Sequence, residues 1–278
     1  MINTIKTLIS PSLKQKLKNF YPFNRSLQYS NFQHNVDQLN LSDFFLFRND
    51  KLDTVFIAEN SLALLTSNPI NCIHKFYFYD QNGSNCGQYE AVSNSFHYKL
   101  IINSEMTGDN SIGGFIHQTE YSKEILDQNP DISLKKLIFH HRGYTGFRRK
   151  DSDFNFYSFL HGNFGGMYMN KGEITSISKQ RSKHFYSPPI IIKSDKTYEL
   201  FFLNPTHKKL RISIFLIDKH NEFRNIGNID INPLGSSRFD INNSSNREIE
   251  NISWKTNLPI GRAIVFENNG ALFDVFHS

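Results

Sequence analysis

The fold is decided by two stretches that resemble each other, Lys75-Phe76-Tyr77-Phe78-Tyr79-Asp80 and Arg211-Ile212-Ser213-Ile214-Phe215-Leu216-Ile217-Asp218. Aromatic and β-branched residues dominate both stretches, and these residues favour pleated strands. Polar and apolar residues alternate in the second stretch, which is the pattern of an antiparallel strand with one face in water. A polar turn follows each, Gln81-Asn82-Gly83 and Lys219-His220-Asn221. The sequence therefore predicts the same strand and turn in each half of the chain.

The resemblance continues outward from these strands, in the same order in both halves. The further pairs are Leu64–Pro69 with Leu200–Pro205, Ser95–Ile101 with Gly235–Ile241, Lys136–Phe139 with Arg262–Phe266, and Asn155–His161 with Leu272–His277. A conserved order of elements separates a repeat from a chance likeness between apolar strands. We therefore predict an all-β protein: two tandem antiparallel β-sandwich domains from an internal duplication, with jelly-roll and immunoglobulin-like topologies both open.

The chain has 278 residues, which is enough for two domains of about 100 to 150 residues, each with its own core. The first domain is expected at 26–165 and the second at 190–278. A linker is expected at 166–189, because Gly165-Gly166 and Pro188-Pro189 bracket a polar, basic stretch there.

Residues 1–25 form a basic amphipathic arm. Apolar residues recur at helical spacing between Ile5 and Phe20, with lysines on the other face and Ser12 as a helix cap. Such a helix can lie on an anionic membrane, contact nucleic acid, or dock its apolar side on the neighbouring domain. We expect docking or a membrane surface rather than nucleic acid, and the side chains that would contact a membrane or anion are Lys6, Lys14, Lys16 and Lys18.

The cellular setting follows from cysteine content and hydropathy. The chain contains only Cys72 and Cys86, fewer than a secreted protein of this size that depends on disulfides would carry. It has no apolar run of membrane-spanning length, and Lys6 interrupts the apolar N-terminus that an export signal requires. A cytoplasmic protein without cofactor is expected, peripheral at the membrane if the arm binds there.

One connection differs strongly between the two copies. The last two strands of the second copy are joined by the short turn Glu267-Asn268-Asn269-Gly270, whereas the first copy has a long loop from His140 to Asp153. That loop is rich in arginine and aromatic residues, which bind acidic groups and stack on sugar rings. The candidate ligand-binding residues are His140, Arg142, Tyr144, Arg148, Arg149 and His161. The alternative is a loop that folds onto its own domain or into the interface between domains.

The histidines of the first copy suggest a metal site, which the spacing argues against. The candidates are His117, His140, His141 and His161, yet neighbouring residues on a strand point to opposite faces. No metal-ligand motif supports them, so no metal is expected. His161 and His277 occupy matching positions in the two copies, which suggests a structural role. Motifs for nucleotide binding or nucleophilic catalysis are also absent from the sequence, which favours a non-enzyme and leaves an enzyme as an open alternative.

Three functions remain open. The first is a non-catalytic binding or accessory module for an anionic or glycan ligand, the second a structural or assembly protein that forms oligomers, and the third a metal-assisted hydrolase. The opening Ile5-Lys6-Thr7-Leu8-Ile9-Ser10-Pro11-Ser12-Leu13-Lys14-Gln15-Lys16-Leu17-Lys18 resembles the basic leader of bacterial surface-polysaccharide assembly proteins. That resemblance implies a link to polysaccharide assembly. The expected architecture resembles the small double jelly-roll capsid proteins of membrane-containing viruses, which implies the second function.

Overall fold

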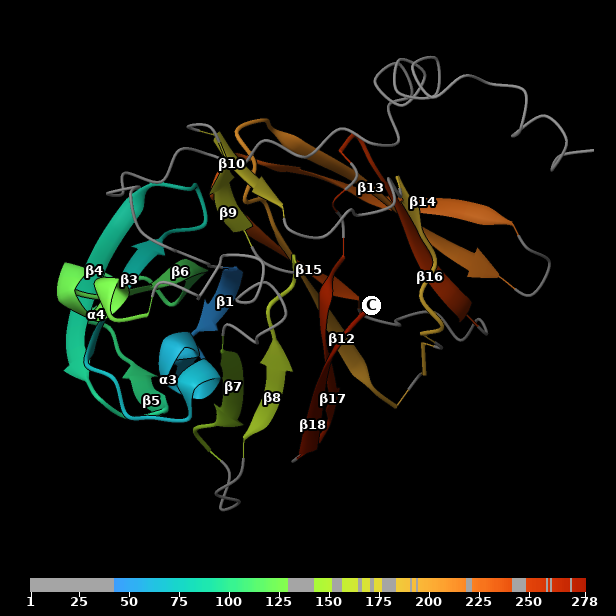
Figure 1. Ribbon diagram of the computed structural model, residues 1–278. Coiled ribbons are helices and arrows are strands. Elements are labelled where there is room, and N and C mark those ends of the chain that lie inside the picture. Colours follow the sequence, from blue (N-terminus) through green and yellow to red (C-terminus); the bar gives the residue numbers. More distant parts are fainter. Residues whose placement is uncertain are drawn as a thin grey trace, which may run out of the picture.

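The protein is all-β, and its strands form four four-stranded antiparallel sheets (Figure 1). The computed structural model describes residues 43–129, 143–151, 157–164, 167–170, 173–176, 184–190, 192–193, 195–218, 222–241, 249–258, 260, 262–270 and 272–278. The expected N-terminal helix and its lysines lie outside the described residues, as do His140, His141 and Arg142.

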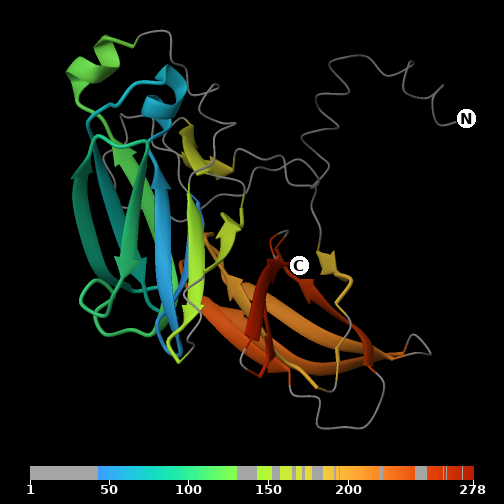
Figure 2. The ribbon, with the colours of Figure 1, turned by 90° about the horizontal axis from the view of Figure 1, so that it is seen from below.

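The first half contains two of the sheets, which pack face to face (Figure 2). One sheet has the order β1 (Phe44–Arg48), β6 (Ile112–Glu120), β3 (Cys72–Tyr79) and β4 (Asn85–Ser93), and the other has the order β5 (His97–Ile102), β2 (Leu52–Glu59), β7 (Tyr144–Arg149) and β8 (Ser158–His161). Their inner faces share a core rich in phenylalanine: Phe45, Phe47, Phe56, Phe76, Phe78 and Phe115. Two short helices, α3 (Ser61–Thr66) and α4 (Lys123–Asp127), follow β2 and β6.

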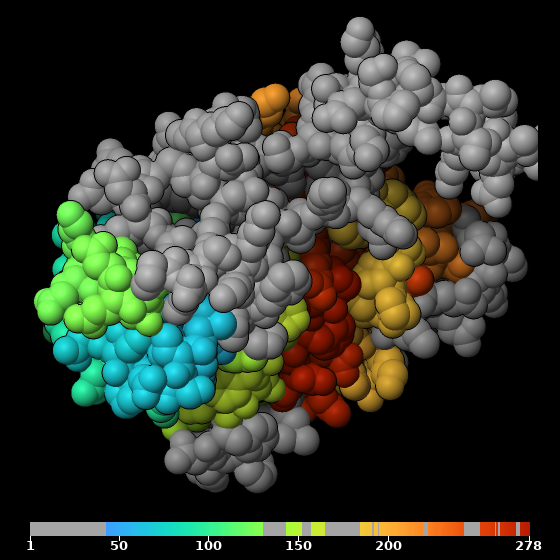
Figure 3. Space-filling view, in the orientation of Figure 1, coloured from blue at the N-terminus to red at the C-terminus, as the bar shows by residue number. Residues whose placement is uncertain are grey.

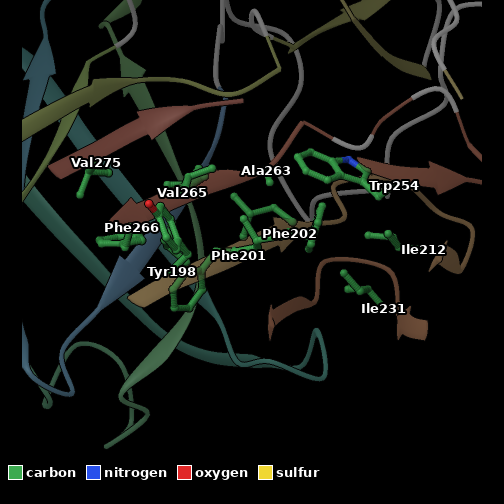
Figure 4. Close-up of a cluster of buried hydrophobic side chains, with 14 of the residues drawn as sticks. Tyr198, Phe201, Phe202, Ile212, Ile231, Trp254, Ala263, Val265, Phe266 and Val275 are labelled. Atoms are coloured by element: carbon green, nitrogen blue, oxygen red, sulfur yellow. The ribbon is translucent and has the colours of Figure 1, made fainter. Parts of the chain in front are cut away.

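The second half repeats this strand order. One sheet has the order β11 (Phe185–Tyr186), β16 (Ile249–Thr256), β13 (Leu210–Asp218) and β14 (Phe223–Ile231), and the other has the order β15 (Ser236–Ile241), β12 (Thr197–Leu203), β17 (Ile264–Asn269) and β18 (Leu272–His277). Each strand of the first half therefore corresponds to the strand of the second half whose number is ten higher, from β1 and β11 to β8 and β18. Figure 4 shows its core, where Trp254 packs edge-on against Phe202 with ring centroids 5.4 Å apart. Between the halves, β9 (Met167–Asn170) pairs with β10 (Glu173–Ser176).

The turns after β3 and β13 confirm that the quoted strands occupy equivalent places. An aspartate stands directly after β3 and at the last position of β13, and its carboxylate accepts a hydrogen bond from the backbone four residues on. The Ser84 N–H donates to Asp80 at 2.8 Å, and the Glu222 N–H donates to Asp218 at 3.0 Å. Asp80 and Asp218 therefore give a common register for comparing the two halves.

Two of the five sequence pairs were wrong. Leu64 to Thr66 belongs to helix α3 rather than to a strand, because the Asn60 side chain caps the helix by accepting a hydrogen bond from the Ala63 N–H at 3.2 Å. The strand that matches β17 is β7 and not Lys136–Phe139, which lies outside the described residues.

Strand β1 joins the two halves, because both of its faces are buried. Phe45 and Phe47 point into the first core, whereas Phe44 and Leu46 pack in a cluster with the core of the second half. This explains the unbroken apolar run of the strand, since a strand covered on both faces does not alternate. The two halves also meet at their edge strands, and Figure 3 shows β18 directly beside β8.

The turn after β3 also touches the second half, and this contact makes a testable prediction. Gly83 has a φ of +88°, and a methyl group there would overlap the Pro233 carbonyl oxygen. Gly270 has a similar φ of +57°, but nothing lies within 4 Å of its added methyl group. We expect Gly270→Ala to cost about 1 kcal/mol, the ordinary left-handed penalty, and Gly83→Ala to cost clearly more. Equal losses in urea unfolding would contradict the contact.

Candidate functional site

The segment predicted as a binding loop is a strand for most of its described length. Residues 144–149 form β7, an inner strand that pairs with β2 on one side and β8 on the other. Thr145 and Phe147 are buried, and Phe147 meets Phe266 of the second half at a ring distance of 5.0 Å. The loop prediction was therefore wrong for this segment, which lies at the junction of the halves.

The structure separates the predicted ligand-binding residues. Tyr144 and Arg148 lie on the outer face of their sheet, where Arg148 pairs with Asp53 at 2.5 Å and lies 5.3 Å from the Tyr157 ring. Arg149 points the other way, towards the junction. It pairs with Asp151 at 2.7 Å and donates a hydrogen bond to the Gly270 carbonyl oxygen.

His161 meets its counterpart from the second half. The two imidazole rings lie 4.8 Å apart, and Nε2 of His277 donates a hydrogen bond of 3.0 Å to the His161 carbonyl oxygen. Burial, and then the nearby charge of Arg262, lower the pKa of His277 to about 4. The matching histidines therefore join edge strands β8 and β18, and His277 is neutral in this contact near pH 7.

A cleft of about 370 Å³ lies at the same junction. Both halves line it with polar and charged side chains, and its lining residues are Arg48, Lys51, Leu52, Arg149, Thr197, Tyr198, Glu199, Arg238, Asp240 and Asn268. The size falls within the usual range of small-ligand sites. Among the predicted binding residues that the structure describes, Arg149 alone lines this cleft.

Arg48 holds the two halves together at the cleft. Its guanidinium bonds Asp50 at 2.9 Å and Glu199 at 2.5 Å, and it lies 4.9 Å from the Phe201 ring. Only 3% of the side chain is exposed. Arg238 adds a second bond to Glu199 at 2.6 Å. Arg48 from the first half is thus inserted into a pocket of the second.

The charges around the cleft balance. The cations Arg48, Lys51, Arg149 and Arg238 face four carboxylates, which are Asp50, Asp151, Glu199 and Asp240. Burial would raise the pKa of Asp50, but the hydrogen bonds and charge of Arg48 outweigh it and lower that pKa. The cleft therefore offers both donors and acceptors without a strong net field.

Of the histidines predicted as metal candidates, the two that the structure describes, His117 and His161, lie apart. His117 is buried in the first core, where its Nε2 lies 2.9 Å from Nδ1 of His74, while His161 lies at the junction. Cys72 contacts His74 at 3.4 Å, and burial raises the pKa of its thiol to about 12. Within the described ranges, no group of three His, Cys, Asp or Glu side chains could hold a metal ion. Among the same residues, no helix has both the length and the hydropathy to cross a membrane.

Comparisons with known proteins add no family. No family model matches the chain, and no curated protein matches it. Two solved structures are weakly similar: a β-glucuronidase from glycoside hydrolase family 2, with 10% identity and a TM-score of 0.17, and a calcium-binding mutant of Bacteroides uniformis β-glucuronidase 2, with 10% identity and a TM-score of 0.15. The alignments cover 92% and 90% of this chain but only 25% and 27% of those chains. Scores this low carry no argument about fold or activity.

Proposed function

We propose that the protein is a non-catalytic binding module that takes a glycan in the cleft between two β-sandwich domains. The observation that carries the proposal is a 370 Å³ cleft lined by four cations, the carboxylates Glu199 and Asp240 and the amide of Asn268. Asp50 and Asp151, outside the lining, pair with Arg48 and Arg149 and offset the remaining positive charge. Sugar hydroxyls act as donor and acceptor at once, so they are matched by side chains of both kinds. A strongly anionic ligand would meet the carboxylates of Glu199 and Asp240 beside the arginines, which makes it the poorer fit.

The sandwich pair is proposed to descend from an internal duplication. The repeated strand order and the shared aspartate turns at Asp80 and Asp218 support this origin. The pairs β2–β5 and β3–β6 correspond to strands B–E and C–F of an immunoglobulin-like sandwich. The pairs β1–β6 and β2–β7 do not occur in that fold, which places its first strand in the sheet of B and its last beside F, so the strand order differs from the simple immunoglobulin-like one.

The carboxylates at the cleft support a non-catalytic role. A general acid needs a pKa raised towards neutrality, whereas Arg48 lowers the pKa of Asp50. Glu199 is held by two arginines, and Asp240 bonds Nε of Arg238 at 2.6 Å. These carboxylates are committed to ion pairs, so we assign them to positioning and ligand hydrogen bonds.

The N-terminal arm completes the proposal. Its five cations would attach the module to an anionic membrane surface, where polysaccharide is assembled, with Lys6, Lys14, Lys16 and Lys18 as the contacts. Sedimentation with vesicles containing anionic lipid tests this part, because binding should fall when these four lysines are replaced.

Glycan binding is tested by calorimetric titration with neutral oligosaccharides and with oligosaccharides that carry uronic acids. We expect saturable binding of the neutral series, weakened about tenfold by Lys51→Ala or Asn268→Ala, which corresponds to one lost hydrogen bond. Lys209→Ala is the matched control, because Lys209 pairs with Asp230 on an exposed surface away from the cleft. Preference for the acidic series would overturn the choice of ligand, and no saturable binding of either would overturn the function.

A further inference from the structure

The halves of the chain meet through two sheet faces. On one side is the outer face of the sheet β1-β6-β3-β4, where Phe44 and Ile116 are buried. On the other side is the outer face of the sheet β15-β12-β17-β18, where Phe201 and Phe266 lie beneath Arg48. Because the strand order repeats, each half contains an equivalent of both faces.

The equivalent of the first face in the second half is exposed and aromatic. It is the outer face of the sheet β11-β16-β13-β14, and its phenylalanines Phe185, Phe215 and Phe223 define what we name the aromatic face. The ring of Phe223 lies 6.2 Å from that of Phe185 and 6.3 Å from that of Phe215. Phe185 is 47% exposed and Phe223 is 57% exposed.

The equivalent of the second face in the first half is also exposed, and it carries apolar side chains beside the ion pair of Arg148 and Asp53. It is the outer face of the sheet β5-β2-β7-β8, named here the open face, and Ile101 and Phe159 are 57% and 45% exposed on it. By the strand registers, Ile57 in the first half is equivalent to Phe201 in the second half. In the same way, Phe159 is equivalent to Val275. Both counterparts in the second half are buried.

One exchange removes from the open face the carboxylate that its counterpart uses to bind Arg48. Glu199 pairs with Phe266 across β12 and β17, and the equivalent pair in the first half is Val55 with Gly146. On the outer side of this sheet, the position that receives Arg48 within the chain is thus taken by Val55, which is fully buried. Apolar residues gathered on one face of a soluble protein mark interaction sites.

We propose that copies of this chain associate head to tail, with the aromatic face of one copy docked on the open face of the next. The occupant is a second copy because one chain carries both complementary faces, and their equivalents are already joined within the chain. A contact between two different faces does not close on itself by a two-fold axis, so it builds an open series of copies or a ring. This head-to-tail association does not depend on glycan binding in the cleft.

The test uses light scattering over a range of concentrations with two single-face variants. Phe223→Asp removes the aromatic face and Ile101→Asp removes the open face, so each variant alone is expected to be monomeric while the wild type forms larger species. Mixed in equal amounts, the two variants should form one heterodimer and nothing larger, since each supplies the face that the other lacks. Phe185→Asp and Phe159→Asp provide a second variant for each face.

Val92→Asp is the control, because Val92 is 75% exposed on edge strand β4 and lies on neither face. It should assemble as the wild type does. A wild-type monomer at all concentrations would overturn the proposal, as would a dimer that persists in one single-face variant, which would indicate a symmetric contact. Lys51→Ala, which tests the cleft, should leave assembly unchanged.

Discussion

Arg48→Met is expected to destabilise the protein by about 3 to 5 kcal/mol, the usual cost of removing one partner of a buried ion pair. Methionine can retain the packing against Phe201 and Phe266, so the loss reports on the charge. Without Arg48, Asp50 and Glu199 would face each other at the junction with Arg238 as their remaining cation. Guanidinium unfolding measures the change.

A double-mutant cycle separates the ion pair from the packing. Glu199→Gln in the Arg48→Met background should recover part of the loss, because it removes a carboxylate that the first change left poorly compensated. The control pair Lys209 and Asp230 is about half exposed, and breaking it should cost less than about 1 kcal/mol. If Arg48→Met costs no more than that control, Arg48 does not hold the halves together.

The protein is expected to lose about 3 kcal/mol of stability as the pH falls from 6.5 to 4, because His74 must stay neutral in the folded state. Burial lowers the pKa of His74 from 6.5 to about 4, and the side chain is fully buried against Cys72 and His117. A folded pKa below the unfolded one means that the unfolded chain binds the proton first. Stability is therefore complete above pH 6.5 and decreases through this window, by about 1.4 kcal/mol per pH unit at most.

His74→Ile is the matched variant for this window. Ile212 stands the same number of residues before Asp218 as His74 stands before Asp80, so the second core already accepts isoleucine there. Urea unfolding at several pH values should show a shallower slope for the variant. His277, whose pKa is also about 4, would supply the slope that remains. An unchanged slope would exclude His74 as the source.

The sequence predicted the all-β class and several strands, because aromatic and β-branched residues mark β3 and β13 clearly. It failed at β7, where Tyr144-Thr145-Gly146-Phe147-Arg148-Arg149 has a single large apolar residue on its inner face. The arginines are accommodated because Asp53 and Asp151 pair with them, and these partners cannot be read from the strand itself. Lys136–Phe139 has the stronger apolar signal, so the sequence favours that segment as the strand.

Most of the residues that line the cleft could not be predicted from the sequence. Its residues come from strands and turns far apart in sequence. Of these residues, the sequence indicated only Arg149 as a ligand-binding candidate, because of its charge. Arg48 ends an unbroken apolar run and Glu199 stands between apolar residues, so in the sequence neither differs from an ordinary surface charge. Their meeting depends on how the two halves dock, which local patterning does not encode.

The two-sided burial of β1 has a consequence for synthesis on the ribosome. The first half emerges with the outward side of β1 bare, and its partners arrive much later: Arg48 and Glu199 are separated by 151 residues. Contacts of such long range form slowly. The nascent chain must therefore wait, with Phe44 and Leu46 uncovered, until the last strands have left the exit tunnel, and this interval is when chaperone capture or misassembly between neighbouring chains would occur.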